Sequence, residues 1–458
     1  MKRVLWVCNI MLPVIAEELG LPYSNREGWL SGIFQQLLEE KEKQIELGIC
    51  FPVTSLPDQL KGQGNKPFRV KGVPCYGLVE NLNTPEVYDA SLEDRFSEIL
   101  ADFQPDMIHI FGTEFPHALA AVKVFDKPEK TLVGIQGLCG EIAKAYMAGL
   151  PEKVQGSVTF RDLLRQDSIR QQQEKFEARG RQEAEIIRGT GNITGRTVFD
   201  KAGTAKMNPK AQYFHMNETM RREFYTGQWD AKACEPYSIF LSQGDYPLKG
   251  MHFALEALAK LLPRFPEAKL YVAGNSIIEQ KNFKQKLKLS AYGKYLLQII
   301  SRYHLEDKVI VTGKLTAEEM KQQFLKSSVF ICPSVLENSP NTVGEAMLLG
   351  VPVVASQTGG IPDMIKDGEE GLLVPVGDVD KLAEAIAAMW TEDAGNDGEQ
   401  QTDCGGDSKP QEAGRKKAED TLAKRLSHAA ARRARITHDG NANYKRLLEI
   451  YDSILNQE

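Results

Sequence analysis

The chain has 458 residues, of which 42% are hydrophobic and 26% charged, and its formal net charge is −6. This length and hydrophobic content suffice for two or three domains, each with its own core. The negative charge argues against a general nucleic-acid binder, which needs a positive surface, so we expect no nucleic-acid partner. The seven cysteines are odd in number and form no CxxC pair, which indicates neither a disulfide framework nor a zinc site. A cytoplasmic location fits best.

The N-terminus, MKRVLWVCNIMLPVI, places two basic residues before an apolar run. Asn9 and Pro13 interrupt that run and no small-residue cleavage site follows, so we interpret residues 4–9 as a buried strand rather than a signal peptide. No segment reaches the ~18 apolar residues that a membrane-spanning helix needs. We therefore expect no membrane span.

Apolar strands alternate with helical patterns in the first half of the chain. Helices are predicted at residues 28–42, 92–103 and 115–125, and a polar helical stretch covers residues 160–188; strands are predicted at residues 4–9, 44–51, 107–112 and 131–137. This alternation is typical of an α/β domain with a doubly wound parallel sheet. We assign residues 1–216 to this first, Rossmann-like domain.

The same alternation restarts at residue 238. Strands are predicted at residues 238–244, 269–274, 308–313 and 329–334, and helices at residues 251–265, 316–327, 342–349 and 379–390. We assign residues 217–237 to an interdomain linker and residues 238–390 to a second Rossmann-like domain. Ligands of open parallel sheets bind beyond the carboxyl ends of the strands, so both domains should contribute loops to one cleft.

The end of the chain differs in composition. Residues 391–420 are rich in Gly, Asp, Glu and Gln and nearly free of large apolar residues, which predicts a mobile insertion. Helical patterns follow in residues 421–458. The region is locally basic, with Arg415, Lys416, Lys417, Lys424, Arg425, Arg432, Arg433 and Arg435. A basic amphipathic helix can rest on an anionic membrane, although such a run is more often a solvated face, and both interpretations stay open.

A strand-to-helix turn within VFICPSVLENSPNTVGEAMLLGVPVVAS, residues 329–356, is the strongest candidate site. Ser339 is a plausible N-cap, and Pro340 suits the first helical position because its missing N–H would be unsatisfied there anyway. The first turn exposes backbone N–H groups that, together with the helix dipole, make a site for an anion such as a pyrophosphate. These groups belong to Asn341, Thr342 and Val343.

Charged residues flank this turn. Glu345 lies four residues after Asn341 on the same helix face, where its carboxylate can accept hydrogen bonds from both hydroxyls of a ribose. Glu337, in the loop before the helix, can reach the other side of the phosphate. Lys249, in the segment YPLKGMH after a predicted strand, can offer a point charge to a diphosphate.

The spacing of glutamate, seven residues and glutamate on this strand, loop and helix resembles the donor-site signature of the retaining family 4 glycosyltransferases, which belong to the glycosyl transferases group 1. The resemblance is weaker before residue 200. It extends over the C-terminal half, where these segments occur in the family's order: LEALAKLLPRFPEAKLYVAG, VIVTGKL, GEAMLLGVPVVAS, GGIPDMI and GLLVPVGDVDKLAEAI. It implies the GT-B fold, in which two Rossmann-like domains face a cleft and the last helix crosses back to the first domain.

The resemblance also implies an activity. A hexose would move, with retention, from a UDP-, GDP- or ADP-sugar to a glycan or lipid-linked acceptor, with no metal or other cofactor, in a process such as cell-surface polysaccharide biosynthesis. Glu345 would hold the ribose and Glu337 the transferred sugar. Lys249 and the loop from Ser339 to Val343 would stabilise the departing diphosphate, which we expect to be the main catalytic contribution. Leu315, in VTGKLT, would contact the nucleobase through backbone groups.

Two positions depart from the family pattern. An arginine often stands five residues before the lysine, where this chain has Gly244. Many relatives carry a histidine near the donor sugar at the position of Gln136, whose amide can hydrogen-bond a hydroxyl but cannot act as a general base. Arg196 is our candidate to supply the missing charge, with a structural ion pair as the alternative. Gly28, where the family commonly has two glycines, would let the backbone approach a phosphate.

Residues near the end of the third predicted strand are candidates for the acceptor side. Glu114 and His117 are placed there, whereas we interpret His109, within the strand, as a buried and hydrogen-bonded core residue. Asp378 and Asp380 resemble a DxD metal motif. Because they open a helix, we interpret them as helix-capping residues and expect no metal site.

Two alternatives from other functional classes remain open. The same two-domain scaffold hosts sugar-nucleotide epimerases and isomerases, which release an altered nucleotide sugar without an acceptor. A non-catalytic sugar-nucleotide binding subunit is the other alternative. For a transferase with a lipid-linked acceptor, we expect a cytoplasmic protein that is also in peripheral contact with the inner face of the membrane.

Overall fold

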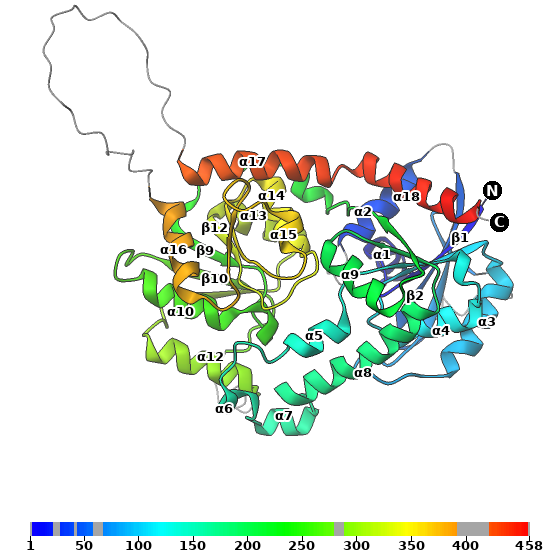
Figure 1. Cartoon of the computed structure of the whole chain (residues 1–458), viewed down its shortest axis with the longest axis horizontal. Helices are drawn as coiled ribbons and strands as arrows, with labels where there is room; N and C mark the ends of the chain where they lie inside the picture. The colour runs from blue at the N-terminus through cyan, green and yellow to red at the C-terminus, as the bar shows by residue number, and fades with distance from the viewer. Residues whose placement is uncertain are drawn as a thin grey trace, which may run out of the picture.

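The computed structural model describes residues 2–21, 28–40, 44–57, 67–278, 288–391 and 421–456. Two α/β domains lie side by side, and each is built on one mainly parallel sheet (Figure 1). The expectation of two Rossmann-like domains is therefore confirmed. The predicted insertion falls on residues 392–420, which lie outside the described residues.

The sheet of the first domain has the order β3-β4-β2-β1-β5-β6-β7-β8 within the described residues. Neighbouring strands are parallel except for β3 and β4, which form an antiparallel edge hairpin. This hairpin was not predicted, because Pro74 and Gly77 interrupt the apolar pattern of β4. The strands are β1 Lys2–Cys8, β2 Ile45–Val53, β3 Phe68–Val70, β4 Val73–Val79, β5 Met107–Phe111, β6 Thr131–Gly134, β7 Asn192–Gly195 and β8 Gln212–His215.

The sheet of the second domain has the order β11-β10-β9-β12-β13-β14, with every neighbouring pair parallel. The direction of winding reverses between β9 and β12, and at such a switch point the loops after the two strands diverge and leave a crevice for a ligand. The strands are β9 Glu235–Leu241, β10 Lys269–Ala273, β11 Val309–Gly313, β12 Ser327–Cys332, β13 Val353–Ser356 and β14 Leu372–Val374. The candidate site residues Lys249 and Glu337 lie in those two loops.

Helices cover the sheets. The first domain contains α1 Pro13–Leu19, α2 Gly28–Glu39, α3 Ser91–Phe103, α4 Pro116–Phe125, α5 Cys139–Ala145, α6 Glu152–Gln155, α7 Phe160–Arg165, α8 Ile169–Arg188 and α9 Val198–Met207, and the 3-10 helix η2 Pro128–Lys130. The 3-10 helix η3 Arg222–Tyr225 follows in the linker. The second domain contains the 3-10 helix η4 Pro247–Lys249, and α10 Met251–Leu261, α12 Ala291–Arg302, α13 Ala317–Lys326, α14 Asn341–Leu349, α15 Ile361–Met364 and α16 Val379–Trp390.

The single helical stretch predicted at residues 160–188 is two helices. Gln166 adopts a left-handed conformation with φ 51°, which ends α7, and Ser168 caps α8 by accepting a hydrogen bond from the backbone of Gln171. Both helices are polar, so no change in the sequence pattern marks the point where α7 ends and α8 begins.

Both faces of the first sheet are covered, as the side chains of β1 show. Trp6 packs in a cluster with side chains of α2 and of the C-terminal helix, whereas Leu5 and Val7 pack with α3 and α4. Successive side chains of a strand point to opposite faces, so an apolar run such as β1 requires helices on both sides.

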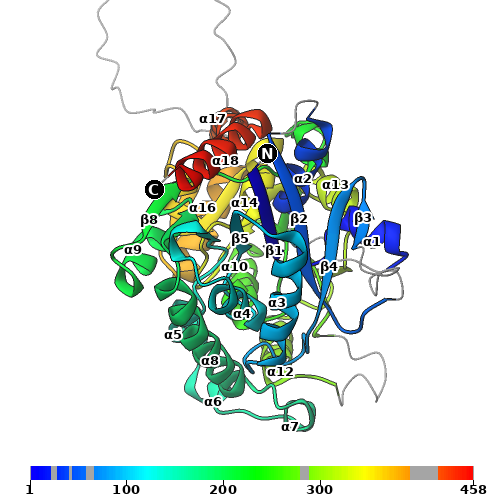
Figure 2. The ribbon, with the colours of Figure 1, turned by 90° about the vertical axis from the view of Figure 1, so that its right-hand side faces the viewer.

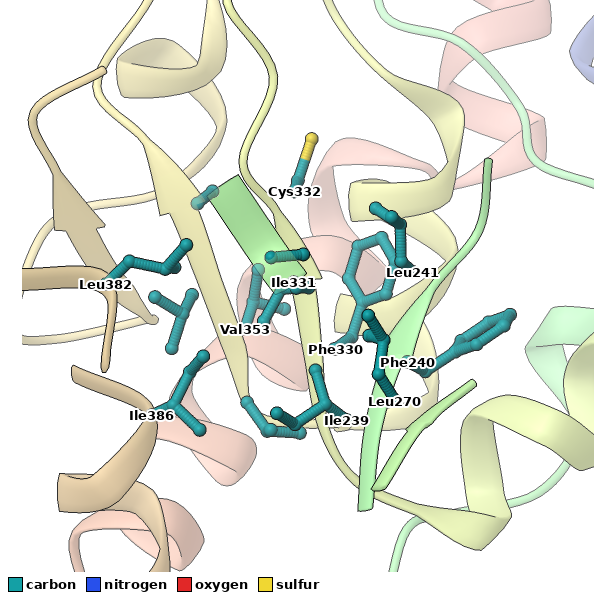
Figure 3. Packing of buried hydrophobic residues seen from close by; sticks show 14 of the residues in the cluster. Ile239, Phe240, Leu241, Leu270, Phe330, Ile331, Cys332, Val353, Leu382 and Ile386 are labelled. Atoms are coloured by element: carbon teal, nitrogen blue, oxygen red, sulfur yellow. The ribbon is translucent and has the colours of Figure 1, made fainter. Parts of the chain in front are cut away.

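The core of the second domain is centred on β9 and β12. Ile239, Phe240 and Leu241 of β9 and Phe330 and Ile331 of β12 are at most 3% exposed and pack together with residues of α16 (Figure 3). Burial of each large apolar side chain contributes about 1.5–3 kcal/mol. This core fixes the two strands whose following loops carry the candidate site.

The C-terminal helices α17 Leu422–Thr437 and α18 Gly440–Leu455 run along one edge of both domains (Figures 1 and 2). Helix α17 packs on α14 and α16, and α18 packs on α2. Tyr451 Oη accepts a hydrogen bond from Trp6 Nε1 at 2.8 Å and lies 2.7 Å from His109 Nδ1. The last helix therefore returns to the first domain, and His109 is the buried, hydrogen-bonded residue that its strand position indicated.

The segment that links β6 to α8 extends to the second domain; we call residues 139–168 the crossing segment. Gly149, with φ 76°, lies so close to Phe253 that an added Cβ would be 2.4 Å from the ring. Asp162 Oδ2 accepts a hydrogen bond from the backbone N–H of Ala291, at the start of α12, at 2.9 Å. The crossing segment is thus fastened to the second domain.

Candidate donor-sugar site

The loop after β12 is held in place by two neighbouring turns. The N–H of Val335 donates to the carbonyl of Leu248 at 2.8 Å, and Thr358 Oγ1 donates to the carbonyl of Val335 at 2.9 Å. Gly359, with φ 53°, approaches the carbonyl oxygen of Glu337 so closely that a Cβ would lie 1.8 Å from it. Only glycine fits there, and the close packing fixes the backbone that carries Glu337.

Lys249 and Glu337, predicted separately, are brought together at the switch point. Lys249 Nζ lies 2.6 Å from Glu337 Oε1, and Ser334 Oγ donates to the same oxygen at 2.8 Å. Burial lowers the pKa of Lys249, but the Glu337 carboxylate outweighs this effect and raises that pKa above its usual value. The site therefore holds a permanent cation beside a carboxylate.

Helix α14 begins at Asn341, with Pro340 at the N-cap position and no side-chain cap from the described residues. The predicted assignment of Ser339 as N-cap and Pro340 as the first helical residue is therefore wrong by one residue. The reason is the extended conformation of Pro340, φ −68° and ψ 118°, which delays entry into the helix. Because no side chain caps the helix, the N–H groups of Asn341 and Thr342 remain suited to an anion. The prediction was wrong for Val343, whose N–H donates to the carbonyl of Pro340 at 3.0 Å.

Glu345, one turn into α14, is 2% exposed and is held by a residue that sequence reasoning missed. Arg221, in the linker, contacts Glu345 Oε1 through Nε at 2.8 Å and Nη2 at 2.7 Å. Burial raises the pKa of Glu345 despite the opposing effect of Arg221. Glu345 Oε2 is buried without a hydrogen-bond partner in the described structure, so it can still accept one from a ligand hydroxyl.

The position at which the family often has an arginine is tightly packed against two side chains. A Cβ on Gly244 would lie 2.6 Å from Met251 Sδ and 2.9 Å from Val272 Cγ1. Gly244 is therefore packed against side chains of α10 and β10, and Met251 and Val272 would have to shift to admit the missing arginine.

Arg196, the candidate replacement, is paired within the protein. Its Nη1 lies 2.8 Å from Glu218 Oε1. Burial raises the pKa of Glu218 to about 7, against the effect of Arg196. The structure thus contains a structural ion pair at Arg196, which was the alternative to a phosphate-binding role. Arg196, Gln136 and Glu218 line a small cavity with His109 and Met216.

The two acceptor-side candidates have different surroundings. Glu114 accepts a hydrogen bond from Asn9 Nδ2 at 2.7 Å, between the ends of β1 and β5, where the winding of the first sheet reverses. Burial raises the pKa of Glu114. His117 is fully buried and its Nδ1 lies 2.7 Å from Glu80 Oε2, because α4 turns the ring inward. An acceptor could therefore reach Glu114 more readily than His117.

Three further positions were predicted from the sequence: Gly28, Leu315 and Asp378. Gly28 is the first residue of α2, and residues 22–27 before it lie outside the described chain, so its phosphate contact stays a prediction. Leu315 follows β11 and packs, half-buried, against the core of the second domain. Asp378 caps α16 by accepting a hydrogen bond from the N–H of Lys381 at 3.0 Å, as interpreted from the sequence.

The described residues lack two further features, a metal-binding cluster and a membrane-spanning helix. No group of three or more His, Cys, Asp and Glu side chains is arranged to hold a metal ion. Among the described helices, none has both the length and the apolar character that crossing a bilayer requires.

Asn338, next to Glu337, joins the site to the first domain. Its Oδ1 accepts a hydrogen bond from Thr197 Oγ1 at 2.7 Å, and its Nδ2 donates to Asp200 Oδ2 at 3.2 Å. A second contact between the domains runs from the N–H of Val198 to Asp363 Oδ2 at 2.8 Å. The domains therefore touch directly beside the loop after β12.

Comparison with known proteins agrees with this geometry. Residues 235–392 match the family model described as glycosyl transferases group 1. The chain is 33% identical over 348 residues, 73% of its length and 75% of the relative's, to phosphatidyl-myo-inositol mannosyltransferase of Mycobacterium tuberculosis. It is 30% identical over 147 residues to WcaL of Escherichia coli, named for colanic acid biosynthesis, and that match covers 31% of this chain and 33% of the relative.

Solved structures show the same fold. Sucrose-phosphate synthase of Thermosynechococcus elongatus aligns over 99% of both chains, with a TM-score of 0.64 and 15% identity. HepE of Anabaena, solved in complex with UDP, aligns over 99% of this chain and 100% of its own, with a TM-score of 0.61 and 14% identity. With these matches, the two mainly parallel sheets identify the fold of this chain as GT-B, as the sequence resemblance implied. With the 33% identity over three quarters of a relative, these findings show that the chain belongs to the glycosyl transferases group 1 family.

Proposed function

We propose that this protein is a retaining, metal-independent glycosyltransferase that moves a hexose from a nucleotide-diphosphate sugar to a glycan or lipid-linked acceptor. One observation carries the proposal. The Lys249–Glu337 pair lies at the switch point of the second sheet, beside the uncapped N-terminus of α14, and Glu345 follows one turn later. A cation, free helix N–H groups and a buried carboxylate match a diphosphate and its ribose.

The diphosphate side of the site supplies the main stabilisation. When the bond from the anomeric carbon to the phosphate oxygen breaks, negative charge grows on the diphosphate. Lys249 stays protonated at neutral pH because the neighbouring carboxylate raises its pKa. With the N–H groups of Asn341 and Thr342, it would stabilise that charge through groups already in position.

The sugar side is assigned to Glu337. Its Oε1 is held by Lys249 and Ser334, which leaves the second oxygen of the carboxylate to face the transferred sugar and its developing positive charge. In a retaining transfer the acceptor hydroxyl would approach on the face that the phosphate leaves. Its oxygen bonds to the anomeric carbon, and its proton passes to the departing phosphate oxygen. No protein base is needed, which fits the amide of Gln136.

The relatives favour an acceptor that is part of a glycolipid or a surface polysaccharide. One is named a phosphatidyl-myo-inositol mannosyltransferase, and the other is named for colanic acid biosynthesis. We therefore assign the protein to cell-surface glycan assembly. A UDP-, GDP- or ADP-sugar is the expected donor.

The test is release of nucleoside diphosphate from a panel of these donors, with and without a bacterial lipid and glycan extract as acceptor. We expect acceptor-dependent release that Glu337→Gln abolishes and that Glu319→Gln, at the exposed cap of α13, leaves unchanged. The anomeric configuration of the product, determined by NMR, should match the donor. An altered sugar nucleotide formed without acceptor would instead show an epimerase, and donor binding without release an inert subunit.

A further inference from the structure

Four large apolar side chains are exposed together on the crossing segment. Val158, Phe160, Leu163 and Leu164 are 59%, 61%, 67% and 68% exposed. They lie in or just before α7, which protrudes at one end of the molecule in both views (Figures 1 and 2). Folded proteins rarely leave neighbouring apolar side chains in water unless another surface covers them. We call these four residues the α7 patch.

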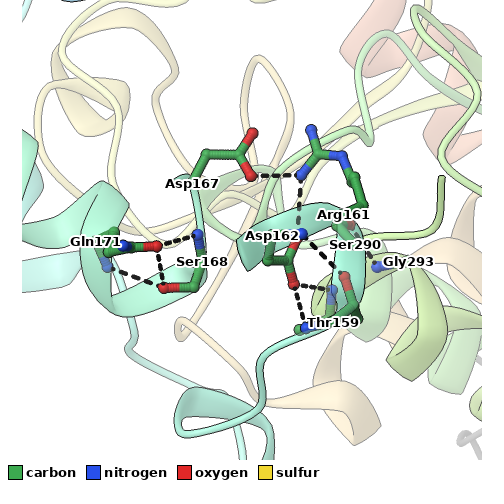
Figure 4. Close-up of polar contacts among 9 residues, drawn as sticks. Thr159, Arg161, Asp162, Asp167, Ser168, Gln171, Ser290 and Gly293 are labelled. Carbon is green, nitrogen blue, oxygen red and sulfur yellow. Dashed lines mark hydrogen bonds and ion pairs between the residues drawn. The ribbon is translucent and has the colours of Figure 1, made fainter. Parts of the chain in front are cut away.

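The α7 patch is presented by a firmly held helix. Thr159 and Asp162 form a capping box at the start of α7, and Asp162 also accepts from the N–H of Ala291 in the second domain. Arg161 pairs with Asp167 at 2.7 Å (Figure 4). These contacts bury Asp162, while Leu163 and Leu164 stay exposed.

Exposed basic residues lie close in sequence to the α7 patch. Lys153, Arg165 and Arg170 are exposed and form no ion pair within the described chain. Of the acidic residues between positions 151 and 170, Glu152 is exposed, whereas the other two contact Arg161. Exposed apolar side chains with unpaired cations on the same and the adjoining helices match the interface of an anionic lipid bilayer, where the apolar groups enter the headgroup region and the cations meet lipid phosphates.

The basic helix α17, the surface suggested by the sequence, is a poorer candidate. Its small and apolar face is buried against α14 and α16, with Leu426, Ala430 and Ala434 at most 2% exposed. Ile436, near its end, is 74% exposed. Helix α17 lies at the opposite end of the molecule from α7 in both views (Figures 1 and 2). A flat membrane could contact α7 or α17, but not both.

We propose that the α7 patch, with Lys153, Arg165 and Arg170, binds the surface of an anionic membrane. The biological use of this surface rests on the proposed function. The crossing segment joins the two domains, so a membrane seated on α7 would bring a lipid-linked acceptor close to the boundary between them. Membrane binding itself needs no transfer chemistry and can be measured separately.

The test is co-sedimentation with phosphatidylcholine vesicles that contain or lack phosphatidylglycerol. Wild-type protein is expected to pellet with the anionic vesicles and only weakly with the neutral ones. Leu163→Ser/Leu164→Ser should lower the partition coefficient at least about tenfold, because two apolar side chains no longer enter the interface. Ile436→Ser, a matched exposed apolar position on α17, should bind as wild type does. Lys153→Glu/Arg165→Glu should remove the preference for anionic lipid.

Three results would overturn the proposal: no binding of the wild type, a loss of binding with Ile436→Ser alone, or an α7 variant that changes only the oligomeric state in light scattering. The last result would identify a second copy of the chain as the covering surface. The substituted side chains are exposed, so the variants should fold, and retained donor binding in a thermal-shift assay would confirm it. Vesicle binding without any transfer activity would contradict the proposed function but leave this surface intact.

Discussion

Arg221 contacts Glu345 Oε1 through both Nε, at 2.8 Å, and Nη2, at 2.7 Å, and so ties the interdomain linker to the donor-site helix. The pair is nearly inaccessible, with side-chain exposures of 14% and 3%. A buried carboxylate at this position needs a cation, and the linker supplies it. The position of the linker and the charge state of Glu345 are therefore coupled.

Arg221→Met should destabilise the protein, because it leaves the Glu345 carboxylate buried and unpaired. Loss of one partner of such a pair costs about 3–5 kcal/mol. Arg222→Met is the matched control, since Arg222 is the next residue and is exposed, and its replacement should cost no more than about 0.5 kcal/mol. Urea unfolding measures both. Equal stabilities of the two variants would show that the Arg221 contact has no energetic role.

Lys249→Gln should lower kcat about 100- to 1000-fold, because a preorganised charge at the leaving diphosphate is lost. Glu337→Gln should lower kcat by a similar factor. The double variant should lower kcat by less than the product of the two single factors, since the side chains act as one pair. Steady-state kinetics with the identified donor gives the comparison. Lys260→Gln, at an exposed ion pair with Asp380, is the control. If the double variant lowered kcat by the full product of the two single factors, Lys249 and Glu337 would not act as one pair.

Gly244→Arg should not improve donor binding, although it restores the family residue. The Cβ alone would meet Met251 Sδ at 2.6 Å, so overpacking of about 1–3 kcal/mol is expected. Gly156→Arg, at an exposed glycine whose Cβ would have no contact closer than 3.7 Å, should be nearly neutral. Thermal unfolding of the two variants provides the measurement. Tighter donor binding by a stable Gly244→Arg protein would refute the steric argument.

Asn338→Ala should loosen the contact between the domains, because it removes the bonds to Thr197 and Asp200. The expected result is a larger radius of gyration in small-angle X-ray scattering without ligand. Asn192→Ala is the control, since among the described residues the side chain of this buried asparagine donates only to carbonyls of its own domain. An unchanged radius of gyration in Asn338→Ala, or an equal increase in Asn192→Ala, would contradict the prediction.

The pH dependence of stability should carry a contribution from Glu218. Burial raises its pKa from 4.5 to about 7, so the folded state holds a proton that the unfolded state releases in this window. The stability from this group is complete below pH 4.5 and is lost as the pH rises to about 7. Glu218→Gln should therefore gain stability relative to wild type, by up to about 3 kcal/mol, across that interval.

The stabilities of Glu218→Gln and wild type must be compared at each pH, because the buried histidines change stability with pH in the opposite direction to Glu218. Burial lowers the pKa of His109 and His252 to about 3 and that of His438 to about 4. Their contribution to stability rises with pH, but it is common to both proteins and cancels in the difference. A difference that stays constant from pH 4.5 to 7 would show that Glu218 does not titrate as described.

The features that could be predicted from the sequence are those encoded locally. The apolar runs of β9 and β12 and the helical spacing in α14 each lie within a few residues, and the positions of Lys249 and Glu337 follow from them. The N-cap of α14 was misplaced by one residue, because the conformation of Pro340 depends on how the loop packs.

Features that depend on distant contacts could not be predicted. Arg221 and Glu345 are 124 positions apart, and Thr197 and Asn338 are 141 apart, and no periodicity marks such pairs. The inward orientation of His117 depends on how α4 packs. Exposure of the α7 patch likewise depends on the second domain, which covers the other side of that helix.

The most direct test of the donor site is a thermal-shift titration of the wild type and Glu345→Gln with UDP-, GDP- and ADP-sugars. A ligand that binds only the folded state raises its apparent stability. We expect one class of sugar nucleotide to raise the Tm of the wild type, and the shift to disappear in Glu345→Gln but persist in Glu319→Gln. No shift with any sugar nucleotide, or an equal shift in Glu345→Gln, would contradict the assignment of this site.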